Sequence, residues 1–124
     1  QGMLDSFKKV KIVEIMDLIR TNVTATAEDD YIGKSANTYD NKLLLVTAIR
    51  GYFMGLEQDE LVQSGYTVDI DVDAQEQWLV SKGVDTSEMS EQEIREADTG
   101  SHVFLLIRCK ILDAIEDIDI QVEI

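Results

Sequence analysis

The chain has 124 residues, of which 44% are hydrophobic, and its formal net charge is −14. The length and the apolar content fit a single domain, residues 1–124, with a core of its own. The negative charge argues against nucleic acid as a partner, because phosphates require Lys and Arg, and against anionic membranes.

The charge is unevenly distributed along the chain. Residues 57–98 contain 13 acidic and 2 basic side chains, whereas the first 56 residues contain seven of each sign. Two interpretations stay open: a solvated face that aids solubility, or a surface that docks a more basic partner. There is no apolar run of the ~20 residues that span a bilayer and no signal peptide, so we expect a soluble protein that is intracellular when made. Gln1-Gly2 resembles a tag remnant and is left out of the fold prediction.

The first predicted element is a helix from Ser6 to about Asp29. Its apolar residues recur at three- and four-residue steps and therefore share one face: Ile12, Ile15, Met16, Ile19 and Val23. In the connector "DDYIGKSANTYD", Gly33 can end this helix, and Asn37, Thr38 or Asp40 can cap the next one.

A second helix is predicted from about Tyr39 to Leu61. Its apolar face consists of Leu45, Ile49, Tyr52, Phe53 and Leu56. Gly51 and Gly55 lie inside this helix at a cost of up to ~1 kcal/mol each. We therefore expect another element to approach closely there.

The next stretch, "YTVDIDVD", alternates, with Val68, Ile70 and Val72 on one side and aspartates on the other, which predicts a strand with one wet face. Trp78-Leu79-Val80 is predicted as a short strand or a loop anchor. "SEQE", from Ser90 to Glu93, has the spacing of a capping box and should open a short acidic helix that ends near Thr99-Gly100.

The last part of the chain predicts two strands. "SHVFLLIRCKILD" is a nearly continuous apolar run, typical of a central strand with both faces covered. A bend from Asp113 to Glu116 leads to a strict alternation from Asp117 to Ile124. The fold class is therefore α+β: two packed helices plus a short third helix against a small mixed or antiparallel sheet, with a C-terminal strand available for exchange.

Motifs for chemistry are incomplete. "GKS" at Gly33 is not a phosphate-binding loop, because the position five residues earlier, which requires glycine, is Glu28. The acidic run from Asp69 is not a calcium loop, because Ala74 and Val80 occupy the positions of its glycine and glutamate. His102 and Cys109 are seven positions apart, which places them on opposite faces of one strand. We expect no catalytic residues, no metal site, no cofactor and no small-molecule substrate.

Four strings follow one another along the chain: "VKIVEIMDLI", "DDYIGKSANTYDNKLLLVTAIRGYFMGLEQ", "MSEQEIREADTG" and "VFLLIRCKILDAIEDIDIQVEI". In this order and spacing they resemble the C-terminal domain of contractile-tail sheath proteins of bacteriophages and phage-like particles. The resemblance covers most of Lys9 to Ile124. It departs from the family where Lys110-Ile111 replaces the usual proline before the bend, and where Ala74 to Glu88 looks longer than usual.

The resemblance implies a structural protein, not an enzyme, that polymerises around a tail tube through inter-subunit strand addition. Its implied partners are other sheath subunits and the tube protein. It would be made in the bacterial host cytoplasm and assembled into a virion tail or phage-like particle. The implied subunit interface consists of Ile118, Ile120, Val122 and Ile124, with Asp113 and Glu116 at the bend. For the tube-facing surface we expect Glu91, Glu93, Ile94 and Glu96.

Two alternatives stay open beside the sheath subunit. One is a strand-capturing adaptor or baseplate-type binding module, which would use the same sheet edge. The other is a small acidic metal-binding protein or enzyme. A sheath domain separated from its assembly should exchange strands or associate, and deletion of Asp117 to Ile124 should abolish that. An enzyme would instead show a concave pocket with converging polar groups.

Overall fold

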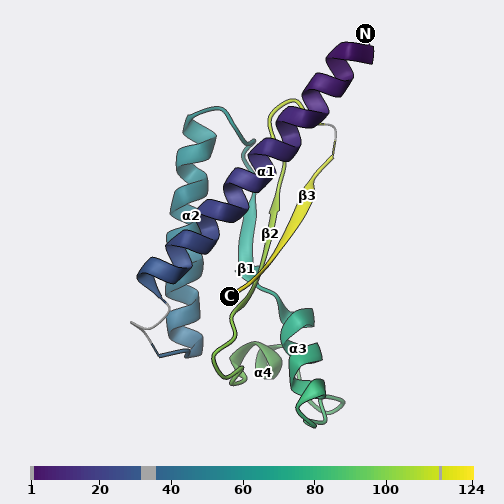
Figure 1. Ribbon diagram of the computed structural model, residues 1–124. Coiled ribbons are helices and arrows are strands. Elements are labelled where there is room, and N and C mark those ends of the chain that lie inside the picture. The colour runs from purple at the N-terminus through teal and green to yellow at the C-terminus, as the bar shows by residue number, and fades with distance from the viewer. Residues whose placement is uncertain (1, 32–35, 115) are drawn as a thin grey trace.

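The computed structural model describes residues 2–31, 36–114 and 116–124 and shows two long helices on one side of a small sheet (Figure 1). The order of elements along the chain is α1 (Gly2–Asp30), α2 (Tyr39–Gln58), β1 (Thr67–Ile70), α3 (Val72–Ser81), α4 (Glu91–Glu96), β2 (Phe104–Cys109) and β3 (Ile118–Glu123). The predicted α+β class is confirmed.

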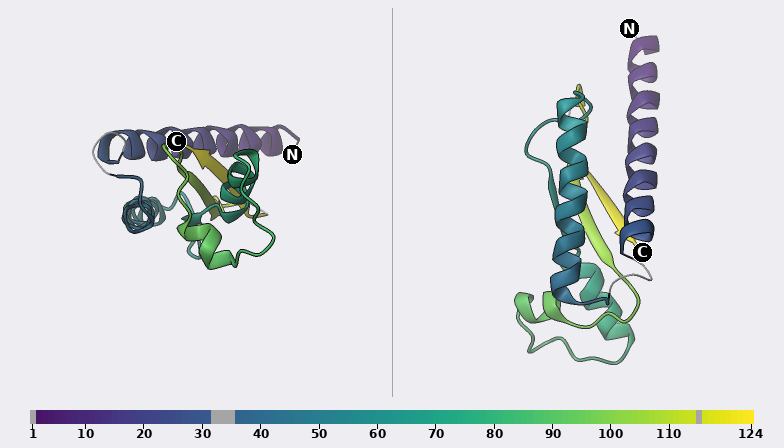
Figure 2. Two further views of the ribbon diagram at one scale, coloured as in Figure 1. Left: turned by 90° about the horizontal axis from the view of Figure 1, so that it is seen from below. Right: turned by 90° about the vertical axis from the view of Figure 1, so that its left-hand side faces the viewer.

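Helix α1 buries the face that its periodicity predicts. Ile15, Ile19 and Val23 are buried, and Ile12 and Met16 pack partly buried against the same cluster. The N-terminal turns of the helix extend past the end of the sheet (Figure 2). The predicted stop at Gly33 lies outside the described residues.

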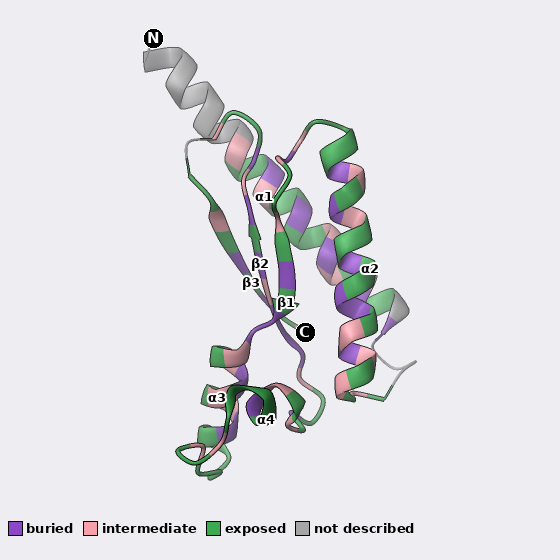
Figure 3. Cartoon of the chain, turned by 180° about the vertical axis from the view of Figure 1, so that it is seen from behind, coloured by how far each residue is buried: buried purple, intermediate pink, exposed green. Residues whose placement is uncertain are grey.

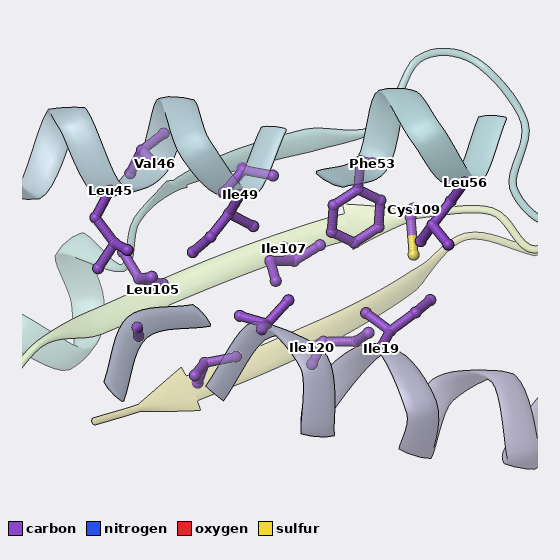
Figure 4. Close-up of a cluster of buried hydrophobic side chains, with 14 of the residues drawn as sticks. Ile19, Leu45, Val46, Ile49, Phe53, Leu56, Leu105, Ile107, Cys109 and Ile120 are labelled. Atoms are coloured by element: carbon purple, nitrogen blue, oxygen red, sulfur yellow. The ribbon is translucent and has the colours of Figure 1, made fainter. Parts of the chain in front are cut away.

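Helix α2 begins after Thr38, whose hydroxyl oxygen accepts a hydrogen bond from the backbone N–H of Asn41 at 3.2 Å. It ends at Gln58, three residues before the predicted end. Its predicted apolar face is confirmed, since Leu45, Ile49 and Phe53 are buried in the main cluster. In Figure 4 these side chains point toward Ile107 of β2 and Ile120 of β3.

No other element approaches the two glycines of α2 closely. A Cβ atom added at Gly51 or at Gly55 would meet no other atom within 4 Å. The expectation of a closely approaching element is therefore wrong for this chain.

The sheet has the order β1-β2-β3, with both pairs antiparallel. Val68, Ile107 and Ile120 stand opposite one another in the register and face the helices, as part of the buried core. The other face is open: Arg108 is exposed and Leu106 is half-buried. The central position predicted for β2 is confirmed, but only one of its faces is covered along its full length.

Strand β1 is shorter than the strand predicted through Val72, because it ends at Ile70. Asp71 instead caps α3 by accepting a hydrogen bond from Ala74 N–H at 3.1 Å. Trp78, Leu79 and Val80 lie inside this helix, so the prediction of a short strand or loop anchor is wrong. Asp71 is buried because its carboxylate is bound to the helix end.

Helix α4 has the predicted capping box. The Ser90 side chain accepts from Glu93 N–H, and the Glu93 side chain accepts from Ser90 N–H. Helices α3 and α4 pack on each other at one end of the sheet and form what we term the α3–α4 lobe, residues 71–100 (Figure 3). Their buried apolar residues, Leu79 and Ile94, lie outside the main cluster, so the lobe has a small core of its own.

Candidate subunit interface at the sheet edges

The terminal strand is held by its own chain in this structure. All six residues of β3 pair with β2, and Val103 and Ile124 exchange both backbone hydrogen bonds at 3.0 and 2.9 Å. Ile120 and Val122 are buried in the main cluster, whereas Ile118 and Ile124 are partly exposed at its border. In the single chain, α1 and β2 cover this apolar side. A neighbouring subunit's strand in this position stays a prediction.

The outer edge of β3 presents free backbone groups. Hydrogen-bonded and non-hydrogen-bonded residue pairs alternate along antiparallel strands. Counting from the Val103–Ile124 pair, the even-numbered residues of β3 bond to β2. The N–H and C=O groups of Asp119, Gln121 and Glu123 therefore point away from β2, and no partner for them is found within the described part of the chain.

The outer edge of β1 is protected instead. The Asp71 N–H bond to Phe104 O sets the alternation, so Val68 and Ile70 turn their backbone groups outward. The Val68 carbonyl accepts a hydrogen bond from Arg50 Nη2 at 3.1 Å, and Ile70 N–H donates to the Asp69 carboxylate at 2.8 Å. Side chains thus occupy two of the four outward groups of this strand, a common means of blocking unwanted pairing.

Two ion pairs lie on the open face of the sheet. Arg108 donates to Asp119 in a bidentate manner at 2.7 and 3.1 Å, and Arg95 donates to Asp69 at 2.8 and 3.0 Å. Each guanidinium lowers the pKa of its carboxyl partner through these hydrogen bonds. The first pair joins residues that stand opposite each other on β2 and β3, and the second joins the α3–α4 lobe to β1.

The two bend residues that were expected at the subunit interface are exposed in the single chain. Asp113 has a φ of 69°, and Asp113 and Glu116 both face solvent. The turn before them is anchored by a bridge between Val62 and Ile111 and by the bond from Leu112 N–H to Leu61 O at 3.0 Å. Position 115 within the bend lies outside the described residues.

The expected tube-facing residues divide into two groups. Glu91, Glu93 and Glu96 are exposed on α4, but Ile94 is only 5% exposed and points into the lobe. Ile94 is therefore a core residue in this chain, and its inclusion in the tube-facing set is corrected. The helical spacing explains this, since one side of even a single turn must pack on the domain.

The reactive side chains are separated. Cys109 faces the main core, where burial raises the pKa of its thiol to about 11. The His102 ring lies beside those of Phe104 and Trp78, at centroid distances of 6.0 and 5.9 Å. Among the residues described, no three His, Cys, Asp or Glu side chains are placed to hold a metal ion. Nor does any described helix have the length and apolar content needed to cross a membrane.

Comparisons with known proteins identify the family of the chain. A family model described as the phage tail sheath C-terminal domain matches residues 5–124. The chain therefore belongs to the phage tail sheath C-terminal domain family, a family of structural proteins. The tail sheath protein of Clostridium phage phiCD119 is 43% identical over 117 residues. The match covers 94% of this chain and 33% of that relative, so the chain spans about a third of the relative's length.

Proposed function

We propose that this chain is the part of a contractile-tail sheath subunit through which subunits join by strand addition as they polymerise around a tail tube. The observation that carries the proposal is the difference between the two edges of the sheet. Arg50 and Asp69 occupy outward backbone groups of β1, whereas the outward groups of β3 belong to exposed residues and have no partner among the described residues. An open edge strand is a template for a strand from another chain.

The terminal strand can also be exchanged between copies. A neighbour's Ile118–Glu123 placed beside β2 would make the same Arg108–Asp119 pair and bury the same Ile120, because identical chains carry identical contacts. The residues around Asp113 and Glu116 would then act as the hinge. This mode requires no new contacts, only a different path of the chain through the bend.

The function is mechanical on this proposal, with no chemistry on a substrate. Subunits that are linked by strands stay joined to their neighbours while the sheath changes from an extended to a more stable contracted packing. The sheath is then an assembly with two stable packings. The exposed carboxylates Glu91, Glu93 and Glu96 of α4 would face the tube. Synthesis in the host cytoplasm and incorporation into a virion tail or phage-like particle follow from this assignment.

A proline at the free edge tests strand addition. Gln121→Pro in the full-length sheath protein removes an N–H that points away from β2, so the β2–β3 ladder should remain intact. Gln121→Thr keeps that N–H and is the matched control. We expect Gln121→Thr to form cylinders in electron micrographs, and Gln121→Pro to fold but to remain as single subunits. Cylinders of normal length from Gln121→Pro would contradict strand addition at the free edge of β3.

A further inference from the structure

The chain enters and leaves the α3–α4 lobe side by side. It passes from Ile70, the last residue of β1, into the lobe, and it returns to the sheet at Phe104, the first residue of β2. Asp71 N–H donates a hydrogen bond to Phe104 O at 2.9 Å, so the two segments cross next to each other. Figures 1 and 3 show the lobe beyond this end of the sheet. A narrow two-segment crossing of this kind has the geometry of a hinge.

The lobe has little apolar core of its own. Within residues 71–100, only Leu79 and Ile94 are both apolar and buried, and neither belongs to the main cluster. A segment this short does not stay folded by itself, since chains below about 40 residues need a disulfide, a metal or a partner. The lobe is therefore kept folded by its contacts with the rest of the domain.

The contacts between the lobe and the first turn of α2 are polar. The ammonium of Lys42 donates to Gln75 Oε1 and Thr99 Oγ1 at 3.1 and 2.8 Å, and all three residues are at most 1% exposed. Asn37, just before α2, donates from Nδ2 to the carbonyl of Gly100 at 2.7 Å. Hydrogen bonds thus fasten the lobe to this helix.

Gln75 extends the hold of Lys42 to α4. Its amide nitrogen donates to the carbonyls of Ile94 and Arg95 at 2.9 and 3.3 Å, while its oxygen accepts from Lys42. Arg95 also pairs with Asp69 of β1, but the Asp69 side chain is 51% exposed, and an ion pair so open to water contributes little to stability. The buried contact of Lys42 is stronger, because its removal leaves a buried acceptor unsatisfied.

A polar junction opens more readily than an apolar core. When the lobe separates from α2, water replaces each hydrogen-bond partner, and the ammonium of Lys42 regains its hydration. Opening of the main cluster would instead expose large apolar side chains such as Phe53 and Ile107, for which water offers no replacement. Regions with few buried apolar contacts open at a lower free energy than the core.

We propose that the α3–α4 lobe opens as a unit of its own, about the crossing at Asp71 and Phe104, while the sheet and the two long helices stay folded, and that Lys42 is the latch that keeps it closed. The use of this opening rests on the function proposed above. There, α4 carries the surface that faces the tube, whereas β3 carries the edge that joins subunits. A lobe that opens separately allows the tube contact to be released while the links between subunits persist.

Native-state hydrogen exchange of the 124-residue chain, read by NMR after ¹⁵N labelling, tests the separate opening. We expect the amides of Leu79 and Val80 in α3 to share one opening free energy with a small dependence on urea. The amides of Leu105 and Ile107 in β2 should exchange at least about 100-fold more slowly, because they require global unfolding. If the α3 and β2 amides have the same opening free energy and the same urea dependence, the lobe opens only with the whole domain, and the proposal is overturned.

Two variants separate the latch from the main core. Ile120→Val removes a methyl group from the core, which stays packed when the lobe opens, so it should speed exchange of the β2 amides several-fold and leave the α3 amides unchanged. Lys42→Met removes a contact that is lost in both kinds of opening, so it should speed exchange of both sets by the same factor, at least about fivefold. Faster α3 exchange in Ile120→Val would overturn the separate opening, and unchanged α3 exchange in Lys42→Met would overturn the latch.

Lys82→Met is the matched control for the loss of a lysine. Lys82 lies in the same lobe and is exposed, so its replacement should change the exchange of either set by less than about threefold. None of these measurements involves a tube or a second subunit. A negative result here therefore stays distinguishable from a failure of strand addition, which would be seen as cylinders from full-length Gln121→Pro.

Discussion

Lys42 Nζ donates a hydrogen bond to Gln75 Oε1 at 3.1 Å, and the two residues are 1% and 0% exposed. The same ammonium donates to Thr99 Oγ1 at 2.8 Å, and the Gln75 amide donates to the carbonyl of Ile94 at 2.9 Å. Burial lowers the pKa of Lys42, and the charge of Asp98 opposes that shift. A long helix of the main core is thus joined to the α3–α4 lobe by buried polar contacts that are all satisfied among the described side chains.

Removal of this ammonium should weaken the junction. Lys42→Met keeps most of the side-chain volume but leaves the oxygen of Gln75 without its donor, which costs about 1–3 kcal/mol. We expect the free energy of unfolding in urea to fall by that amount. Lys82→Met is the control, because Lys82 is exposed, 5.6 Å from the centre of the Trp78 ring, and should change stability by less than about 1 kcal/mol. A Lys42→Met chain as stable as the wild type would show that the junction does not depend on this contact.

The glycines of α2 should be replaceable in the isolated chain. Gly51→Ala and Gly55→Ala each add a methyl group where no atom lies within 4 Å, and alanine lowers the entropy of the unfolded chain. We expect each change to stabilise the domain by about 0.5–1 kcal/mol in thermal or urea unfolding. Gly65→Ala is the contrasting control, because Gly65 has a φ of +94° that alanine adopts only with strain. Destabilisation by both helical changes would contradict the open environment of these positions.

The sequence predicted those parts of the fold in which apolar periodicity and burial coincide. Ile15, Ile19 and Val23 of α1, and the capping box at Ser90, illustrate this agreement. Helix α3 was not predicted because its buried face includes a polar residue, Gln75, which interrupts the apolar pattern.

The protected edge of β1 could not be predicted either. The guanidinium of Arg50 and the carbonyl of Val68 are 18 positions apart, and their contact depends on how α2 lies along the strand. The burial of Lys42 could not be predicted for the same kind of reason, since its partners come from α3 and from the segment after α4. A charged residue at a buried helix position carries no signal of its tertiary partner in a single sequence.

Truncation of Ile120 measures how firmly the chain holds its own terminal strand. Ile120 is fully buried between β2 and the helices, so Ile120→Ala should lower the free energy of unfolding by about 2–5 kcal/mol. Its neighbour Asp119 is exposed, and Asp119→Ala should lower the free energy of unfolding far less, although it removes the pair with Arg108. Urea unfolding of the dilute chain measures both. If both substitutions lowered the free energy of unfolding by the same small amount, β3 would not be packed against its own chain.

The thiol of Cys109 provides a pH-dependent test of the core. Its pKa is raised from 9.0 to about 11 by burial, so between these values the folded chain binds a proton that the unfolded chain has released. Stability that is fully present below pH 9 is therefore lost as the pH rises through 11, by about 2–3 kcal/mol. The wild type should lose this much more than Cys109→Ala over the same pH range in urea unfolding. Parallel losses in the two proteins would show that the thiol ionises without cost in the folded state.

Charge reversal on α4 tests the proposed contact with the tube. Glu91 and Glu96 are exposed, so Glu91→Lys with Glu96→Lys should leave the melting temperature of the domain nearly unchanged. Glu93 is better changed to Gln, which keeps the capping box with Ser90 while it removes the charge. We expect the triple variant of the full-length sheath to bind tail tubes several-fold more weakly in co-sedimentation. Glu14→Lys, Asp17→Lys and Glu28→Gln on the exposed side of α1 change the net charge by the same amount and serve as the control. Tube binding that is weakened equally by both sets would assign the effect to overall charge instead of to α4.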